Sequence, residues 1–369
     1  MSNASESRLP HASEGASAPA TVRTWPRLSI RPGINRLHSL IGRRQPDIIA
    51  AAVDRWEIAP ASALEVRPAR MLDGQIDRIK AAEFGSIAEV VKDFRGGSDA
   101  MQAPTMGYRI KDAWLIDGVL YAGGAVRHLR PRSTLRPAEL VPGEPLRAAL
   151  YESWLGNRWF GNWLFDDCLA YMLAQQAGRP FTSRVSIGHM PTYERALGMR
   201  PLRRTVARFE ELLLFDDHPN NEHKRARADQ FRLRLTGERK ARHPGVFLLR
   251  GHSGDRRLLV NERAIAERLA AKRGFTILDP CAAGLDEIID ICSEAMVVAG
   301  VEGSHLVHGL MLMPPEARAF VIQPPDRTVS ALKRLADRQG QDFATLIGVG
   351  THEAFSVDGD EVERTLDLP

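Results

Sequence analysis

A glycine-containing turn, Gly300-Val301-Glu302-Gly303-Ser304, is the stretch whose residue types and spacing point most directly to ligand chemistry. It follows an apolar run at Ala295–Ala299 and precedes a helical pattern at His305–Met313. Glycines let a backbone approach a ligand closely, and the free N–H groups at a helix start favour a phosphate or a carboxylate. An ordinary strand-to-helix turn has the same pattern, so both interpretations stay open.

Arginines surround the same expected crevice. Arg250 closes the apolar run Val246–Leu249, and Arg256 and Arg257 follow in a loop. A guanidinium matches phosphate oxygens in a bidentate manner, so two of these side chains could clamp a diphosphate. Surface salt bridges are the commoner role of arginine, but a place at a strand end favours a ligand contact for Arg250.

Three carboxylates are candidates for proton transfer. Asp166 and Asp167 follow a cluster of aromatic residues and begin or lie within a helix, and Glu302 lies in the glycine turn. One aspartate could be the general base for a hydroxyl acceptor, with tryptophans stacking on sugar faces. The alternative is a helix start with acidic first-turn residues above core aromatics. Glu302 would repel a phosphate unless it binds a sugar hydroxyl or acts as the base.

No metal site is expected from the spacing of ligands. His305 and His308 are one helical turn apart without an obvious third ligand, and Asp358-Gly359-Asp360 lies in a polar turn near the end of the chain. The three cysteines, at positions 168, 281 and 292, show neither metal spacing nor a disulfide framework, which favours a reducing compartment.

The elements that must position these residues alternate between strands and helices over Gly245–Arg327. Strands are expected at 246–249, 275–278, 295–299 and 320–322, and helices at 261–272, 285–294 and 305–313. This order predicts a parallel sheet with helices on both faces, and a ligand site at the carboxyl ends of its strands.

Upstream, Asp117-Gly118 between apolar runs predicts a hairpin, and the segments from Leu150 to Phe215 allow a second α/β unit. The basic stretch Glu222–His243 lies where a linker between two domains is expected. A solvated helix face is the preferred interpretation of that stretch, ahead of nucleic-acid binding.

Composition sets broad limits. The chain has 369 residues, 44% of them hydrophobic, which suits two domains, and its formal net charge of +4 is too small to argue for nucleic acid. No run approaches the roughly 18 apolar residues of a membrane span, so any membrane contact is expected to be peripheral. The polar, small-residue N-terminus is expected to be disordered and lacks the apolar core of a secretion signal.

Several short motifs together resemble the glycosyltransferase 61 family (the DUF563 group), which includes capsular polysaccharide biosynthesis proteins. They occur in the order Phe247-Leu248-Leu249-Arg250, Arg257, Asn261-Glu262, Gly274-Phe275, the turn at 300–304, Pro314-Pro315 and Val321-Ile322. Upstream, Gly161-Asn162-Trp163-Leu164-Phe165-Asp166 resembles the family's His-Trp-Leu-Leu-Asp stretch, and Tyr193–Gly198 resembles its Leu-Gly helix.

The resemblance implies an inverting transferase of GT-B architecture, an α/β fold in which two Rossmann-like domains with parallel sheets face each other across a cleft. We therefore expect a disordered segment at 1–22, an acceptor-side α/β domain at 23–236, and at 237–369 a Rossmann-like nucleotide-sugar-binding domain with a helical tail. The donor diphosphate would be held by Arg250, Arg257, Gly303, Ser304 and His305. Asn162 and Trp163 would lie on the acceptor side, with Asp166 as candidate base and Glu302 as its rival.

The implied reaction moves a sugar from a nucleoside-diphosphate sugar to a glycan or lipid-linked acceptor in bacterial capsular or exopolysaccharide synthesis. No further cofactor, no metal and no nucleic-acid partner is expected, and the location is cytoplasmic, with possible peripheral association at the inner membrane. Two positions depart from the family, which usually has histidine where this chain has Glu302 and Asn162. The alternative is therefore a noncatalytic GT-B-like partner protein that binds nucleotide or glycan.

Overall fold

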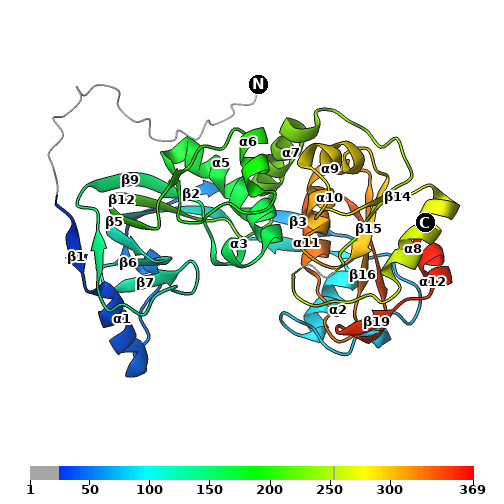
Figure 1. Ribbon diagram of the computed structural model, residues 1–369, viewed down its shortest axis with the longest axis horizontal. Coiled ribbons are helices and arrows are strands. Elements are labelled where there is room, and N and C mark those ends of the chain that lie inside the picture. The colour runs from blue at the N-terminus through cyan, green and yellow to red at the C-terminus, as the bar shows by residue number, and fades with distance from the viewer. Residues whose placement is uncertain (1–24, 252–253) are drawn as a thin grey trace.

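The computed structural model describes residues 25–251 and 254–369, so the expected disordered segment 1–22 lies outside the described residues. The molecule is elongated, with one sheet toward each end and a group of helices between them (Figure 1). The chain runs from the region on the left to the region on the right, apart from one excursion early in the sequence.

The C-terminal region is built on a five-stranded parallel sheet. Its strands are β13 (Val246–Leu248), β14 (Thr276–Leu278), β15 (Val297–Val301), β16 (Arg318–Gln323) and β17 (Asp342–Ile347). They lie in the order β14-β13-β15-β16-β17, and every neighbouring pair is parallel. The predicted parallel sheet over residues 245–327 is confirmed, and β17 extends it.

Helices cover both faces of this sheet because alternate residues of each strand point to opposite sides. Val298 and Val321 belong to a core shared with α9 (Leu285–Cys292), α10 (Leu306–Leu312) and α11 (Ala331–Gln339). Their neighbours Ala299 and Phe320 belong to a second core with α8 (Glu262–Arg273) and α12 (Gly359–Leu366). A small hairpin of β18 (Val349–Thr351) and β19 (Ala354–Ser356) adds to the latter side.

The N-terminal region holds an eight-stranded mixed sheet. Its strands are β2 (Ala52–Ala59), β5 (Thr105–Ile116), β6 (Val119–Ala122), β7 (Ala125–His128), β9 (Pro145–Leu150), β10 (Pro180–Thr182), β11 (Leu202–Arg203) and β12 (Val206–Asp216). Seven lie in the order β11-β10-β9-β12-β5-β6-β7, and β2 also pairs with β5.

The prediction of a second parallel sheet is wrong, because the strands of this region pair in both directions. β5 is antiparallel to β2, β6 and β12, whereas β9 is parallel to β10 and β12. The predicted hairpin at Asp117-Gly118 is confirmed, with φ angles of 47° and 75° that suit a two-residue turn. Such short connections allow only antiparallel neighbours, which is why this sheet is not Rossmann-like.

Helices fill the space between the two sheets (Figure 1). They are α3 (Trp154–Arg158), α4 (Phe160–Asn162), the π-helical turn η3 (Trp163–Asp167), α5 (Cys168–Ala177), α6 (Met190–Ala196) and α7 (Glu222–Thr236). One apolar core runs from these helices into α9, α10 and α11 of the C-terminal region. The two sheets are therefore joined through a continuous packed layer.

The basic stretch 222–243 begins with α7, which is not a linker, and only one side of this helix is the expected solvated face, where Arg225 and Arg234 are exposed. Lys224 and Arg227 are fully or nearly fully buried, and Phe231 packs in the shared core. Composition predicted solvent exposure for these cations because it does not show that buried carboxylates pair with them.

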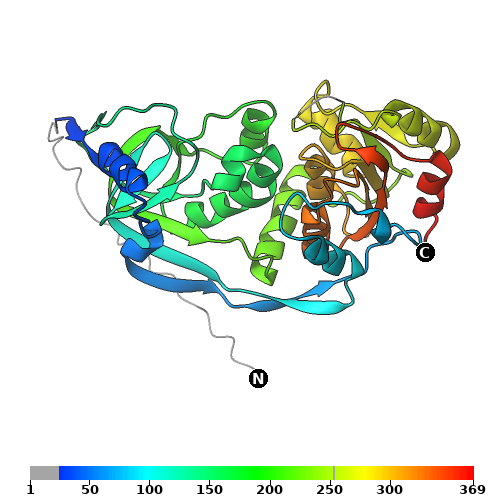
Figure 2. The same cartoon turned by 90° about the horizontal axis from the view of Figure 1, so that it is seen from below.

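An early excursion of the chain reaches the C-terminal sheet. β3 (Ser62–Val66) and β4 (Ser98–Gln102) form a ribbon that runs along the molecule, with α2 (Ile87–Arg95) at its far end (Figure 2). The Arg70 amide donates to the Phe343 carbonyl at 2.8 Å, and the Phe94 and Phe343 rings stack with centroids 6.2 Å apart. The predicted domain boundary between residues 236 and 237 stays a prediction. The early excursion was assigned to the N-terminal domain, but it packs against the region assigned to the C-terminal domain.

Short elements complete the described fold. They are β1 (Arg27–Ser29), paired with β8 (Glu139–Val141), α1 (Arg31–Leu40), and the 3-10 turns η1 (Ile48–Ala51) and η2 (Ile76–Arg78). Among the described residues, no helix has the length and apolar character needed to cross a membrane.

Replacing Phe94 by Ala should lower the free energy of unfolding by about 3–5 kcal/mol, because it removes a fully buried ring from the joint between α2 and β17. Urea denaturation measures the change. Met101→Ala, on the same excursion but 73% exposed, is the matched control and should change stability by less than about 0.5 kcal/mol. Equal effects of the two substitutions would show that the excursion is not docked.

Candidate functional site

A cavity of about 260 Å³ lies between α4 and the carboxyl end of β15. It brings together Asn162, Arg257 and the turn residues Glu302 and Ser304, which come from three separate parts of the sequence. The remaining wall is mostly apolar and aromatic, and its residues are Phe84, Leu155, Trp159, Gly161, Phe165, Val307, Val329, Ser330, Ala331, Leu332 and Arg334.

The cavity is bounded by a close contact between the two regions. A Cβ atom at Gly161 would lie 3.0 Å from Cγ2 of Val307 and 3.2 Å from Oγ of Ser304. Any side chain at Gly161 would therefore push α4 away from the turn at 300–304. Glycine at this position places Asn162 beside the ends of the parallel strands.

Arg257 and Glu302 form an ion pair on the cavity wall. Nε of Arg257 lies 2.9 Å from Oε2 of Glu302, and both side chains are less than 10% exposed. The guanidinium also donates to the Glu302 carbonyl at 3.4 Å. The negative charge of Glu302 is thus offset by Arg257. Glu302 therefore need not repel an anion bound at the turn.

Arg250 lies behind the glycine turn and supports it. Its NH1 group donates to the Glu302 carbonyl at 3.2 Å, and a Cβ atom at Gly303 would lie 1.8 Å from the same nitrogen. Burial, and then the charge of Arg257, lower the Arg250 pKa to about 10, so the group stays charged at neutral pH. A side chain at Gly303 would therefore displace the Arg250 guanidinium from the turn.

His305 adds no positive charge to this site. Burial, followed by the nearby charge of Arg250, holds the pKa of the His305 imidazole well below its usual value. A neutral imidazole can donate or accept one hydrogen bond but cannot supply a cation for a diphosphate.

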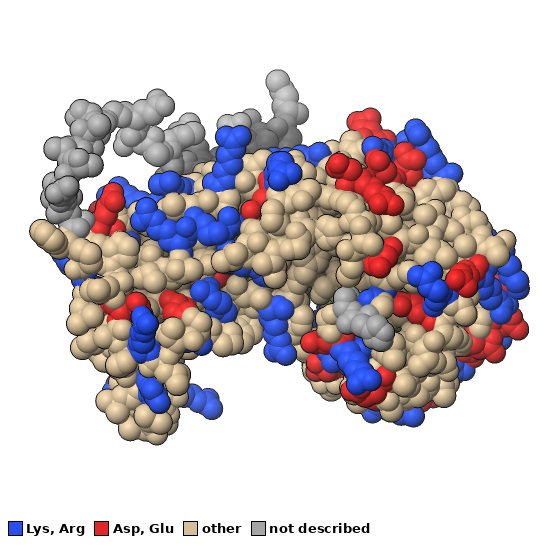
Figure 3. Space-filling view, viewed as in Figure 1, with Lys and Arg blue, Asp and Glu red and all other residues tan. Residues whose placement is uncertain are grey.

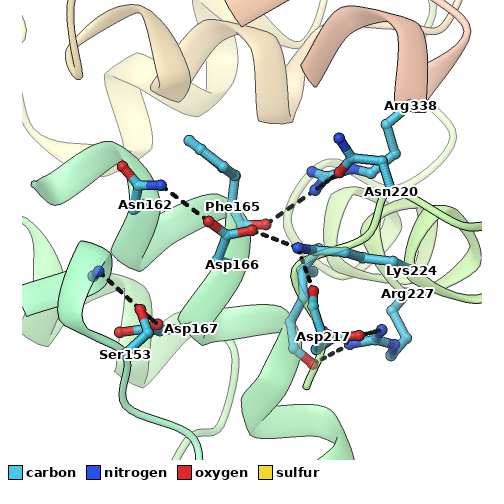
Figure 4. A network of polar contacts seen from close by, with 12 residues as sticks. Ser153, Asn162, Phe165, Asp166, Asp167, Asp217, Asn220, Lys224, Arg227 and Arg338 are labelled. Carbon is cyan, nitrogen blue, oxygen red and sulfur yellow. Dashed lines mark hydrogen bonds and ion pairs between the residues drawn. The ribbon is translucent and has the colours of Figure 1, made fainter. Parts of the chain in front are cut away.

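Asp166 does not line this cavity; its half-buried carboxylate belongs to a polar network (Figure 4) and borders a second, smaller hollow. Its carboxylate accepts from Asn162 Nδ2 at 3.0 Å and from Lys224 Nζ at 2.5 Å. Lys224 also donates to the Asp217 carbonyl, and the Asp217 carboxylate binds Arg227 through two hydrogen bonds of 2.5 and 2.8 Å. Asn162 is the link between this network and the cavity.

Asp167 has a different environment from its neighbour. It is buried, accepts a hydrogen bond from Ser153 Oγ at 2.6 Å, and lies away from Lys224 (Figure 4). Burial raises the Asp167 pKa well above the usual range, with a further contribution from the Asp166 charge. A carboxyl group that is fully buried and bonded to Ser153 is consistent with a structural role.

The predicted acceptor-side residues separate in the structure. Asn162 lines the cavity, but Trp163 is 2% exposed and packs against Phe160 and Tyr193 in the shared core. Trp159 lines the cavity instead, with Phe84 at its edge at a centroid distance of 5.4 Å. The aromatic cluster in the sequence was a correct signal, but only the helix register tells which ring faces the opening.

Within residues 25–251 and 254–369, no group of three or more histidine, cysteine or acidic side chains is placed to hold a metal ion. The expectation that no metal is needed remains a prediction.

His308 lies deep behind the site. Its Nδ1 atom lies 2.8 Å from the Tyr193 hydroxyl, and its ring packs against Phe160 and His189. Burial, with a smaller effect of His189, lowers the His308 pKa to about 3. The imidazole is therefore neutral in the folded protein and joins α10 to α6.

Residues 160–320 match the family model described as Glycosyltransferase 61. The resemblance expected from the motifs is confirmed over this stretch, which contains Asn162, Arg257, Glu302 and Ser304 of the cavity but not Phe84 or Trp159. The match supports glycosyltransferase activity as the class of function.

No curated protein matches the chain. Among solved structures, the metal-soaked Flv1 flavodiiron core from Synechocystis sp. PCC6803 is similar over 71% of this chain and 64% of its own, so this chain spans less than two thirds of it. The sequence identity is 10% and the TM-score is 0.23, a likeness that carries no argument.

His308 should make the protein less stable as the pH falls. Its folded pKa, about 3, is below the unfolded value of about 6.5, so the unfolded chain takes up the proton first. The stabilising contribution is complete above about pH 6.5 and is lost toward pH 3. Between pH 7.5 and 5.0 this group alone should cost about 2 kcal/mol.

His308→Gln should remove that part of the pH dependence, and urea denaturation at the two pH values measures it. His218, which is exposed, supplies the control substitution His218→Gln, which should leave the pH dependence unchanged. An unaltered pH dependence in a folded His308→Gln variant would contradict the assignment.

Proposed function

We propose that the protein is an inverting glycosyltransferase that binds a nucleoside-diphosphate sugar in the cavity between α4 and the end of β15. The observation that carries this proposal is the convergence of Arg257, Glu302, Ser304 and Asn162 on one cavity, with Arg250 directly behind its turn. Ligands of parallel α/β sheets bind outside the carboxyl ends of the strands, where these residues lie.

The chemistry of the proposed site follows from its charges. Arg257 and the N–H groups of Gly303 and Ser304, which precede α10, would stabilise the negative charge that develops on the leaving diphosphate. Arg250 would hold the turn in position through the Glu302 carbonyl. The aromatic wall of Trp159, Phe84 and Phe165 offers flat apolar surface for a nucleobase or a sugar face.

Inversion needs a base for the acceptor hydroxyl, and Glu302 is better placed for this role than Asp166. Glu302 lines the cavity, whereas both Asp166 oxygens are engaged by Asn162 and Lys224. We propose that Asp166 positions the Asn162 amide, and that Glu302, where the family usually has histidine, accepts the proton.

The wider setting is proposed from the family. The two regions would act in the manner of a GT-B enzyme, with the donor held by the C-terminal sheet. The acceptor would be a glycan or lipid-linked sugar in bacterial capsular or exopolysaccharide synthesis, at a cytoplasmic location that permits peripheral contact with the inner membrane. No nucleic acid and no metal take part.

Arg257→Ala should weaken binding of the preferred nucleoside diphosphate by about tenfold or more, since charge-assisted hydrogen bonds are worth about 1.5–3 kcal/mol and Glu302 would lose its counter-charge. Arg250→Ala should have an effect of the same size by releasing the turn. Isothermal titration with a panel of nucleoside diphosphates measures both.

The control for these variants is Arg256→Ala, because this neighbouring side chain is exposed and pairs with Glu353 outside the cavity. Its affinity should equal that of the unaltered protein. If folded Arg257→Ala and Arg250→Ala also bind normally, the diphosphate site lies elsewhere.

Glu302→Gln should lower turnover by about a hundredfold or more while nucleotide affinity changes by less than about threefold, because a general base contributes roughly 10²–10⁴ to the rate. Release of nucleoside diphosphate from sugar donors in the presence of an acceptor panel measures turnover. Asp166→Asn is the comparison, and a greater loss there with full activity in Glu302→Gln would return the role of base to Asp166.

A noncatalytic partner protein that binds nucleotide or glycan is the second candidate. The observation that favours it is that Asp166, the expected base, is sequestered with Lys224 and does not line the cavity. Tight nucleotide binding without donor turnover across the acceptor panel would support this candidate over the enzyme.

A further inference from the structure

α1 turns its apolar side toward solvent. Ile30, Ile34, Leu37 and Ile41 follow one another at helical spacing, and their exposed fractions are 60%, 44%, 57% and 65%. An amphipathic helix on a globular protein ordinarily buries such a stripe against the core. Here the stripe has no partner among the described residues.

The polar side of the same helix faces the protein. The Arg31 guanidinium lies 5.3 Å from the centre of the Trp114 ring. Gly33 donates its N–H to the Pro137 carbonyl at 2.8 Å. These contacts fix the orientation of α1, so the outward apolar stripe is part of the fold.

Neighbouring strands extend the apolar surface. Leu28 of β1 and Leu140 of β8 are directly paired across the two strands, and they are 65% and 63% exposed. β1 and α1 lie at the same end of the molecule (Figure 1). In Figure 3 the lobe that α1 forms is largely uncharged, with basic side chains on it.

The chain segment that carries this stripe has charges of one sign, while Asp112 and Glu139 lie beside it from other strands. Residues 25–46 contain no aspartate or glutamate and five arginines, at positions 27, 31, 36, 43 and 44. Arg36, Arg43 and Arg44 are exposed. A basic segment with an outward apolar stripe suits the interface of an anionic bilayer, where apolar residues enter the acyl boundary and arginines meet headgroups.

We propose that α1, with the adjacent Leu28–Leu140 pair, docks the protein on the surface of an anionic phospholipid membrane. A second copy of this chain fits less well, because a symmetric contact would bring the same arginines against one another. The inference goes beyond the proposed donor site and does not depend on it, since none of these residues lines the cavity.

The test is cosedimentation of the full chain with vesicles of phosphatidylcholine alone or with one quarter phosphatidylglycerol. The protein should bind the mixed vesicles, with little binding to phosphatidylcholine alone, and 0.5 M NaCl should weaken the binding. The variants Ile34→Ser/Leu37→Ser/Ile41→Ser and Arg43→Gln/Arg44→Gln should each lower the partition coefficient by about tenfold or more.

Matched controls come from exposed residues of the C-terminal region. Val260→Ser/Met296→Ser removes apolar surface and Arg256→Gln/Arg263→Gln removes charge, and both should bind vesicles within about twofold of the unaltered protein. Nucleotide affinity should be the same in all four variants, which separates this test from that of the donor site.

Equal binding to both kinds of vesicle, or unchanged binding by the α1 variants, would overturn the proposal. So would a dimer in sedimentation velocity that the Ile34/Leu37/Ile41 variant dissociates while vesicle binding is absent, because α1 would then be an interface between copies of the chain.

Discussion

The structure depends on the close contact between α4 and the turn that follows β15. Gly161 permits this contact, since even one added carbon would lie 3.0 Å from Val307. The apolar core continues through the helices from one sheet to the other, so both walls of the cavity belong to one packed layer.

Buried charges on the two sides of this contact differ in their access to the cavity. On the C-terminal side, Arg257 and Glu302 are paired on the cavity wall, where a ligand can compete for either partner. On the N-terminal side, Lys224 and Arg227 are enclosed with Asp166 and Asp217, and burial of Asp217 is outweighed by these cations, which lower its pKa. Removing one member of such an enclosed set leaves an uncompensated buried charge. The set therefore maintains the fold and its geometry more than it takes part in a reaction.

The sequence predicted the C-terminal sheet well because its strands and helices follow strict hydrophobic periods. The expected strand at 295–299 is β15 (Val297–Val301), and the expected helix at 285–294 is α9 (Leu285–Cys292). The N-terminal sheet was harder, because β12 pairs with both β5 and β9 and these long-range pairings leave no local mark on the sequence. The burial of Lys224 and Arg227 in α7 was not predicted, because lysine and arginine are usually exposed unless they have buried partners.

Site residues, like secondary-structure elements, could be predicted where the signal is local in the sequence, and not where it depends on tertiary contacts. Arg257, Glu302, Ser304 and Asn162 lie on one cavity, as strand ends and glycine turns predict, and their functional roles stay predictions. Trp159 and Phe84 were missed as cavity residues, since Phe84 arrives on the early excursion of the chain and the packing of its ring against Trp159 is a tertiary feature. Asp166 stands four residues after Asn162, and only the structure shows that its carboxylate turns toward Lys224.

Hydrogen–deuterium exchange with a saturating nucleoside diphosphate would test the central claim, that the nucleotide binds between α4 and the end of β15. Exchange should slow at the amides of the 300–305 turn, around Arg257, and in α4, because these groups would be covered or held by the ligand. Protection confined to other segments, such as the basic helix α7, while the 300–305 turn exchanges as in the free protein, would contradict the account.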